Sequence, residues 1–371
     1  MSEKGARSMK NLCTWAALAA LAAVFAGGAA LADASEPAEG EYVVRNFSFA
    51  SGESLPELRL HYTVLGKPHR DPAGRVDNAV LILHGTGGSG HSFLQDKFAG
   101  VLFGPGRLLD TRRYFIILPD GIGHGDSSKP SDGLHARFPR YAYADMVAAQ
   151  YALVTEWLKV DHLRLVMGTS MGCMQTFMWG ESHPDFVDAL MPLACLPVPI
   201  AGRNRVWRDL ILEAIKADPD WQGGDYKAEP TRALRTAAGM LLIAGSAPLA
   251  FQASLPTAQA ADEFVAKYMQ RELSALDAND LYHQIDASRD YDPSGDLEKI
   301  AAPVMWVNSA DDFINPPELD IAQREVKRLP HGRFVLLPAS TETHGHGTHT
   351  WAAIWQNYLK ELLDSSGSRG P

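Results

Sequence analysis

Cysteine is scarce in this chain, with three residues among 371. Cys13 lies near the N-terminus, which leaves Cys173 and Cys195 in the body of the protein. Both occur in apolar sequence, where a free thiol usually packs as a small hydrophobic group. A domain of this size is stable on its core alone and does not need cross-links. One disulfide is compatible with the sequence but is not implied by it.

Runs of lysine and arginine are also missing. The 34 basic side chains are outnumbered by 44 acidic ones, which gives a formal net charge of -10. No basic segment could follow a phosphate backbone, so nucleic acid is excluded as a partner. A hydrophobic content of 46% with 21% charged residues is typical of a folded globular protein and excludes a disordered chain.

Long hydrophobic runs are limited to the N-terminus. There, basic residues precede an alanine-rich apolar run over 12–30, and Ala30-Leu31-Ala32 supplies the small residues that a signal peptidase accepts. This layout predicts a signal peptide over 1–32, cleavage before Asp33, and export to the periplasm or the medium. An uncleaved N-terminal anchor is the alternative, because the run is nearly long enough to span a bilayer. After cleavage we expect no stable membrane association.

Short apolar runs alternate with longer stretches of helical periodicity. The predicted strands are 42–47, 58–64, 79–83, 114–118, 163–167, 189–193, 304–307 and 333–337. The clearest helices are predicted at 145–158 and 351–363. This alternation predicts an α/β protein, with a mostly parallel sheet and helices on both of its faces.

The alternation lapses between about 197 and 300. Helices are predicted there at 210–215, 233–243 and 261–276, without intervening strands. Because the strand pattern resumes at Val304, we interpret this stretch as a helical lid inserted into one domain over 40–371.

A candidate nucleophile lies in Gly168-Thr169-Ser170-Met171-Gly172, which follows a predicted strand and opens a helical stretch. In a sharp strand-to-helix turn of this kind the serine hydroxyl projects above the sheet, and the flanking glycines allow close backbone contact. The alternative interpretation is a turn of small residues that only tightens a strand–helix contact. The strand before and the helix after favour Ser170 as a nucleophile.

A serine nucleophile needs a base, and the base needs a carboxylate that fixes its tautomer. In the α/β-hydrolase fold the chain order is serine, acid, histidine. Asp311 and Asp312 both follow the predicted strand 304–307. We favour Asp312 as the acid, because an acid four residues before a proline, here Pro316, is the common arrangement in this fold.

The predicted base lies in the loop after the last strand, which contains three histidines. We favour His346, since Gly345 and Gly347 give its loop a permissive backbone, and we expect His349 to begin the final helix. The alternatives are a polar loop or a metal cluster that includes His344. The spacing lacks a fixed helical face and a neighbouring carboxylate, so we predict no metal.

The oxyanion hole is expected to combine the backbone N–H of Met171 with that of Thr86, in the glycine-rich loop 83–88. His84 and Gly85 of the same loop are expected to border the substrate. A phosphate-binding loop is the alternative, but neither G-x-x-x-x-G-K-[ST] nor G-x-G-x-x-G occurs there.

Blocks along most of the mature chain resemble the homoserine O-acetyltransferase-like group of α/β hydrolases. The blocks are Asp145-Met146-Val147 with Gln150, Ser170-Met171-Gly172 with Met174-Gln175, Ala214-Ile215 with Asp218-Pro219-Asp220-Trp221, Gly223-Gly224-Asp225-Tyr226, and Gly345-His346. The resemblance implies a two-step acyl transfer without a cofactor. Ser170 would take an acyl group from a small-molecule ester or thioester, and an alcohol or water would then remove it.

Two positions depart from the group's pattern. Leu212 stands where homoserine-using relatives carry an arginine that binds the substrate carboxylate. Arg208 lies one helical turn earlier, and we expect both residues to line the substrate pocket. Gly347 stands where those relatives carry an aspartate. Loss of a bidentate clamp argues against homoserine as the acceptor. An exported enzyme would also lack cytoplasmic acyl-CoA.

We therefore favour a carboxylic-ester hydrolase. An O-acyltransferase that uses acyl-CoA and a non-catalytic binding module on the same fold are the alternatives. The sequence leaves a homodimer open.

Overall fold

The structure is a computed structural model that describes residues 36–367, so the predicted signal peptide lies outside the described residues. Its centre is an eight-stranded sheet in the order β1-β2-β4-β3-β5-β6-β7-β8. The β1–β2 and β2–β4 pairs are antiparallel and the remaining pairs are parallel. The strands are β1 (Ala38–Ser48), β2 (Ser54–Leu65), β3 (Ala79–Leu83), β4 (Phe115–Pro119), β5 (Leu165–Thr169), β6 (Leu190–Leu193), β7 (Val304–Ser309) and β8 (Gly332–Leu337). The predicted α/β class and mostly parallel sheet are confirmed.

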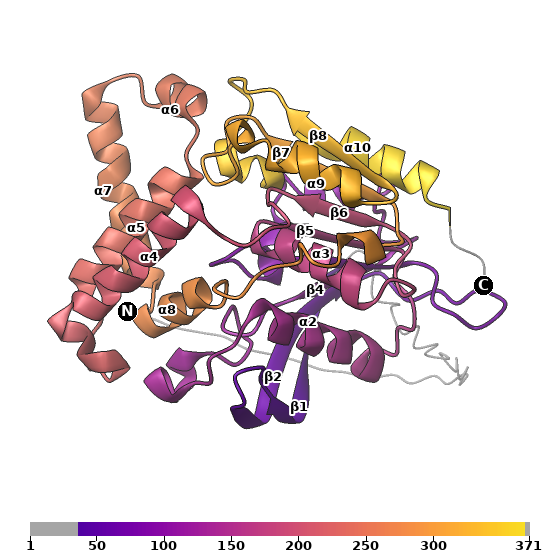
Figure 1. The fold of residues 1–371 in the computed structure, drawn as a ribbon, viewed down its shortest axis with the longest axis horizontal. Coiled ribbons are helices and arrows are strands. Elements are labelled where there is room, and N and C mark those ends of the chain that lie inside the picture. Colours follow the sequence, from indigo (N-terminus) through magenta and orange to yellow (C-terminus); the bar gives the residue numbers. More distant parts are fainter. Residues whose placement is uncertain (1–35, 368–371) are drawn as a thin grey trace, which may run out of the picture. The chain divides into compact units, whose positions relative to one another are not determined.

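Helices cover both faces of the sheet (Figure 1). One face packs against α2, α3 and α9, where Met146 and Phe177 share a core with Trp306 of β7. The other face packs against α1 and α10, which contribute Leu102 and Trp355. Strands that are buried on both faces form continuous apolar runs in the sequence, which explains why their positions could be predicted. The helices are α1 (Ala99–Leu102), α2 (Tyr143–Ala152), α3 (Met171–Ser182), α9 (Ile321–Glu325) and α10 (Ala352–Ser365).

Between β6 and β7 the chain forms five helices that lie beside the sheet, at the left of Figure 1. They are α4 (Gly202–Ala217), α5 (Thr231–Gly245), α6 (Pro248–Ser254), α7 (Ala258–Ala275) and α8 (Ala278–Asp286). We call this segment the lid. Its own core contains Ile211, Leu234 and Leu281, and Ile314 from the loop after β7 joins it. The sequence did not predict α6 and α8, which are too short to establish a helical period.

No single described helix is long and apolar enough to cross a bilayer. Only α5 taken together with α6 meets that length and composition, and these two helices are bent by 104° at their junction.

Candidate active site

Ser170 occupies a strained turn between β5 and α3. Its backbone angles are φ 54° and ψ -110°, outside the regions that a serine normally adopts. The turn also requires both glycines. A Cβ at Gly168 would lie 2.1 Å from the carbonyl oxygen of Gly172, and a Cβ at Gly172 would lie 2.0 Å from that of Leu83. The sequence therefore folds here so that the Ser170 hydroxyl stands at the C-terminal edge of the sheet.

The Ser170 hydroxyl, the His346 imidazole and the Asp312 carboxylate form a chain of hydrogen bonds. The Oγ atom of Ser170 is 2.8 Å from Nε2 of His346, and Nδ1 of His346 is 2.9 Å from Oδ2 of Asp312. Because a carboxylate only accepts, Nδ1 carries the proton and Nε2 is left to accept from the serine hydroxyl. The structure brings together the three residues that chain order singled out, from the ends of β5, β7 and β8.

Asp312 is buried and held by several donors. Its Oδ1 accepts from the backbone N–H of Ile314 at 2.7 Å, and its Oδ2 accepts from Nδ2 of Asn315 at 2.9 Å. Burial opposes ionisation of Asp312, but the charge and hydrogen bond of His346 and these donors outweigh it and hold its pKa below the ordinary value. Asp312 is therefore an anion at neutral pH and can stabilise a positive imidazole.

Asp311 has a different set of partners from its neighbour. Its Oδ2 accepts from Oγ1 of Thr343 at 2.7 Å and from the backbone N–H of Gly345 at 3.2 Å, and its Oδ1 accepts from Ser309. Thr343 and Gly345 belong to the loop that carries His346. Asp311 thus ties that loop to the end of β7 without touching the imidazole hydrogen-bond chain.

The other two histidines of this loop have separate environments. His344 stacks on Trp351, with ring centroids 4.2 Å apart. The His349 ring is half-buried with its centroid 5.2 Å from that of His346, and desolvation followed by the charge of His346 lowers its pKa to about 3. It lies in a 3-10 turn, Gly345–Thr350, and α10 begins only at Ala352, three residues later than we expected for a helix start at His349.

The glycine-rich loop after β3 lies against Ser170. A Cβ at Gly85 would lie 3.2 Å from Cβ of Ser170, so the loop backbone approaches the hydroxyl closely, with Thr86 next in the chain. Met171 opens α3, where the first backbone N–H groups have no partner within the helix. This is the position at which two backbone donors can meet an oxyanion.

His84 supports this loop from behind. Its Nδ1 donates to the carbonyl of Gly85 at 2.8 Å, and its Nε2 accepts from the backbone N–H of Gly121 at 2.9 Å. Burial lowers its pKa, so the ring stays neutral in the tautomer that these bonds require. His84 is 3% exposed, and both of its ring nitrogens are hydrogen-bonded to loop backbone.

Two structural supports near the nucleophile were not predicted. Nε2 of Gln150 donates to Oε1 of Gln175 at 2.7 Å, and Nε1 of Trp179 donates to Oε1 of Gln150 at 2.9 Å, which joins α2 to α3 in the core. Cys173 and Cys195 form a disulfide that links the first turn of α3 to the segment after β6. Partners this far apart in the chain leave no local sequence signal.

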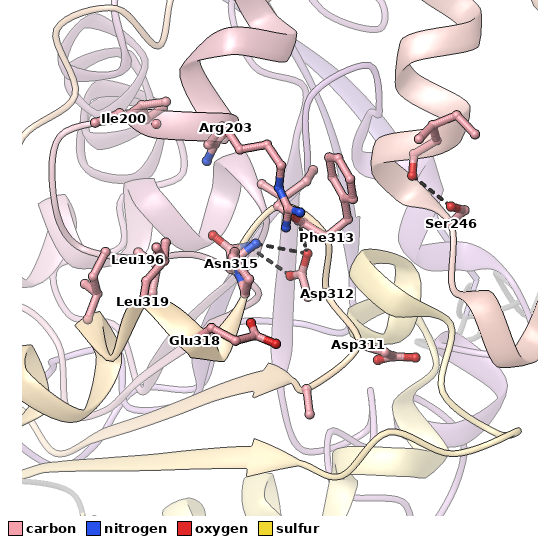
Figure 2. A pocket seen from close by; sticks show the side chains of 18 of the residues that line it. Leu196, Ile200, Arg203, Ser246, Asp311, Asp312, Phe313, Asn315, Glu318 and Leu319 are labelled. Atoms are coloured by element: carbon pink, nitrogen blue, oxygen red, sulfur yellow. Dashed lines mark hydrogen bonds between the residues drawn. The ribbon is translucent and has the colours of Figure 1, made fainter.

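A cavity of about 920 Å³ lies between the lid and the loop after β7. Figure 2 shows Leu196, Ile200 and Leu319 on one side of it and Asp312 at its wall. Met174, one helical turn after the nucleophile, also lines it, whereas Ser170 does not. Most of the other lining residues are apolar, among them Val198, Pro199, Ile243, Ala247, Pro248, Phe251, Phe313, Ile314 and Ile321.

Arg203, a charged residue that lines this cavity, has partners of its own. The exposed guanidinium of Arg203 lies 3.9 Å from the Phe313 ring and donates to the Phe313 carbonyl oxygen at 2.5 Å. Arg208 and Leu212 do not line the cavity: both are 2% exposed inside the lid. Arg208 donates to Ser288, and Leu212 belongs to the lid core. These two predicted pocket residues are packed within the lid, because both lie on the inward face of α4.

Comparisons with known proteins agree with this architecture. The family model described as alpha/beta hydrolase fold matches residues 78–342. A homoserine O-acetyltransferase of Moorella thermoacetica is 31% identical over 84% of this chain and 93% of its own length. An ethyl acetate hydrolase of Pseudomonas veronii is 30% identical over 76% of this chain and 82% of its own length.

Among solved structures, the acetyl esterase MekB has a TM-score of 0.77 with 26% identity, covering 88% of this chain and 97% of its own. A homoserine O-acetyltransferase of Bacillus anthracis, at 20% identity, supports the fold with a TM-score of 0.78, covering 90% of this chain and 99% of its own. These relatives and the hydrogen-bonded serine show that the chain belongs to the α/β-hydrolase-fold family, as a serine acyl-transfer enzyme of the homoserine O-acetyltransferase-like group.

Proposed function

We propose that this protein is an exported carboxylic-ester hydrolase that works through an acyl-enzyme on Ser170. The observation that carries the proposal is the hydrogen-bonded chain of Ser170, His346 and Asp312 beside a large apolar cavity. The hydroxyl has a base within reach, and the base has a buried anion behind it.

In the first step, Oγ of Ser170 attacks the ester carbonyl while its proton passes to Nε2 of His346. The negative charge that develops on the carbonyl oxygen faces the backbone N–H groups of Met171 and Thr86. Asp312 stabilises the imidazolium and keeps it oriented. Collapse of the tetrahedral intermediate breaks the ester C–O bond, and His346 returns the proton to the departing alcohol.

In the second step a water molecule takes the place of the alcohol. His346 accepts a proton from the water as its oxygen attacks the acyl carbonyl, and the same two N–H groups hold the new oxyanion. The bond to Oγ then breaks, Ser170 regains a proton from His346, and the carboxylic acid leaves.

The cavity supports an uncharged substrate with a bulky apolar group. Its volume of about 920 Å³ far exceeds the space that an acetyl group needs, and aliphatic and aromatic side chains dominate its lining. Arg203 is engaged with Phe313, and Leu212 lies inside the lid core, so neither offers a free clamp for an amino-acid carboxylate.

An O-acyltransferase is the second candidate, because several relatives carry that activity in their names. A probable acyltransferase of Methanothermobacter thermautotrophicus is 30% identical over 80% of this chain and 89% of its own length. The proposed export argues for water as the acceptor, since it removes the enzyme from acyl-CoA. The Cys173–Cys195 disulfide supports export, because such bonds persist in oxidising compartments.

The test is turnover of p-nitrophenyl esters from acetyl to dodecanoyl, with and without added alcohols such as homoserine. We expect hydrolysis without any alcohol and a higher kcat/KM for longer chains than for acetyl. A strict requirement for an alcohol would identify a transferase, and the absence of any turnover with or without alcohol would leave only a binding role.

Export has its own test. The full-length chain is expressed with its native N-terminus, and the N-terminal sequence of the periplasmic or secreted product is determined. We expect it to begin at Asp33. Full-length protein in the membrane fraction would identify the N-terminal segment as an anchor.

A further inference from the structure

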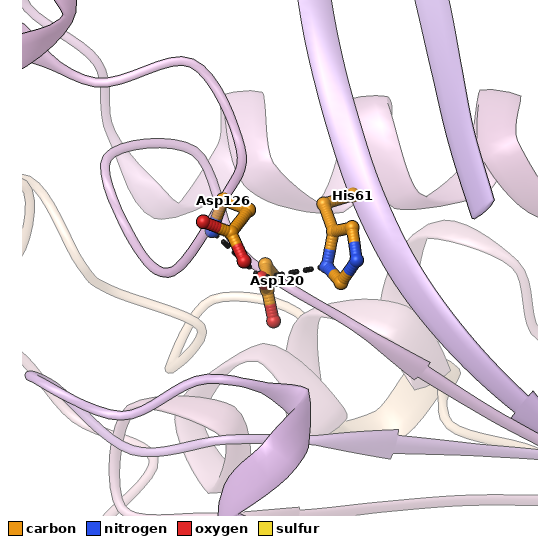
Figure 3. A group of neighbouring side chains, drawn as sticks. All are labelled: His61, Asp120 and Asp126. Atoms are coloured by element: carbon orange, nitrogen blue, oxygen red, sulfur yellow. Dashed lines mark hydrogen bonds and ion pairs between the residues drawn. The ribbon is translucent and has the colours of Figure 1, made fainter. Parts of the chain in front are cut away.

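A cluster of imidazoles and carboxylates lies apart from the proposed catalytic residues, where the β1–β2 hairpin meets the loops after β3 and β4. Figure 3 shows Asp120 between His61 of β2 and Asp126. His61 and its neighbour His91 stack with ring centroids 6.0 Å apart and planes 12° from parallel. Glu39 of β1 completes the cluster, as its carboxylate contacts both rings.

Both imidazoles present the same nitrogen to the same carboxylate. Nε2 of His91 is 2.8 Å from Oε1 of Glu39, and Nε2 of His61 is 3.7 Å from Oε2. Ligand atoms of a four-coordinate zinc ion lie about 3.3 Å apart, given bonds of about 2.0–2.1 Å. Glu39 is thus within reach of both rings, but the ligand atoms of these three described residues are not all within 4.8 Å of one another, so an ion requires His91 and Glu39 to move toward His61. The His91 and Glu39 side chains are 45% and 58% exposed, so they are free to adjust around an ion.

The other ring nitrogen of His61, Nδ1, has a partner that fixes the orientation of the ring. Its Nδ1 donates to Oδ2 of Asp120 at 3.0 Å. Asp120 is 2% exposed, and it also accepts from the backbone N–H groups of Gly90 at 2.7 Å and Asp126 at 2.9 Å. Its carboxylate therefore cannot turn away. A carboxylate that orients an imidazole through Nδ1 and leaves Nε2 free is the usual support of a metal-bound histidine.

We propose that Glu39, His61 and His91 form a binding site for a divalent transition-metal ion, and that this ion is Zn²⁺. Asp120 is the residue that orients His61. Two imidazole nitrogens and one carboxylate oxygen are the ligand types that zinc prefers. When an ion binds, it takes the place of the proton through which Nε2 of His91 contacts Glu39, and that proton moves to Nδ1 of the same ring or to solvent.

Such an ion would connect three segments of the fold. It would join β1 and β2 to the 3-10 turn Gly90–Leu94, which follows the loop carrying Thr86. Because the ion binds the folded protein, it would raise the melting temperature progressively as the free ion concentration increases. The inference is independent of the proposed catalytic activity and needs no substrate for its test.

The test is calorimetric titration of ZnCl₂ into the mature, tag-free, chelator-treated protein. We expect one equivalent to bind with a rise in Tm, and Co²⁺ in its place to give the visible absorption of a four-coordinate site. His91→Ala and Glu39→Gln should each weaken binding by at least tenfold. Asp120→Asn should weaken Zn²⁺ binding roughly 10- to 100-fold, which is the usual effect of losing a residue that orients a metal ligand.

His69→Ala is the matched control, since His69 is 68% exposed and also pairs with a carboxylate, that of Asp77 at 2.7 Å. It should bind Zn²⁺ as the wild type does. The exposed positions of Glu39 and His91 make their variants safe for folding, which circular dichroism verifies. No binding by the wild type, or equal binding by wild type, His91→Ala and Glu39→Gln, would overturn the proposal.

Discussion

Asp311 and Asp312 are adjacent in the chain, yet their carboxylates bind different parts of the same loop. Oδ2 of Asp312 is 2.9 Å from Nδ1 of His346, whereas Oδ2 of Asp311 accepts from Oγ1 of Thr343 at 2.7 Å. One carboxylate contacts the imidazole and the other holds the backbone that carries it.

Asp312→Asn should therefore impair turnover far more than Asp311→Asn. Loss of the triad acid removes the correct tautomer and the charge partner of His346, an effect that reaches about 10⁴ in kcat. Asp311→Asn weakens one support of the loop, worth about 0.5–1.5 kcal/mol, or roughly tenfold at most. Steady-state kcat of the two variants decides between them, and equal losses or the reverse order would move the acid to Asp311.

Ser170→Ala should abolish turnover and leave the fold intact. The change removes one hydroxyl, while the strained backbone at this position is held by its glycine neighbours. A fluorophosphonate probe followed by peptide mapping provides the measurement. We expect modification at Ser170 in the wild type and none in the variant, and labelling of a different residue would contradict the assignment.

Removal of the disulfide should lower stability without removing a catalytic group. Cys173 and Cys195 are buried and 22 residues apart, and the chain-entropy model gives about 3 kcal/mol for a loop of this length. Urea unfolding of the Cys173→Ala, Cys195→Ala double variant measures it. Wild-type protein treated with reductant should approach the variant, and unchanged midpoints in both would show that the bond does not form.

Glu181 should make stability depend on pH. Burial, followed by the charge of Asp296, raises its pKa to about 8, and its Oε1 has no hydrogen-bond partner. The folded state thus holds a proton that the unfolded state releases near its ordinary pKa. Its contribution to stability is present at low pH and falls as pH rises toward 8.

Glu181→Gln should remove this pH dependence and stabilise the protein at pH 8.5 by about 1 kcal/mol, because partial solvent exposure reduces the effect. Unfolding midpoints of wild type and variant between pH 5 and 9 provide the comparison. Parallel curves would show that Glu181 ionises normally.

Leu212→Arg with Gly347→Asp tests the departures from the homoserine-using pattern. The resemblance to that group implies that these changes would raise use of an amino-acid alcohol. The structure places Leu212 in the lid core, where an arginine would be a buried charge without a partner. We now expect loss of stability by about 3 kcal/mol or more and no gain in O-acyl homoserine, measured by product partitioning with a fixed donor.

The positions of the sheet and of the three hydrogen-bonded side chains could be predicted because both have local signals. Buried parallel strands read as apolar runs, and Ser170, Asp312 and His346 each follow one of them. The Cys173–Cys195 bond and the contacts of Glu39 with His61 join distant positions, and nothing nearby in the sequence marks them. Leu212 shows the same limit, since only packing decides which face of α4 points inward.

The contact between Gly345 and the lid restricts how the lid can be changed to alter the substrate range. All three proposed catalytic residues lie outside the lid, whereas much of the cavity wall comes from 196–204 and 243–251. A Cβ at Gly345 would lie 2.5 Å from the carbonyl oxygen of Ser246, so the lid touches the residue that precedes His346. A lid taken from a relative must therefore fit this glycine at its α5–α6 junction and accept Ile314 in its core.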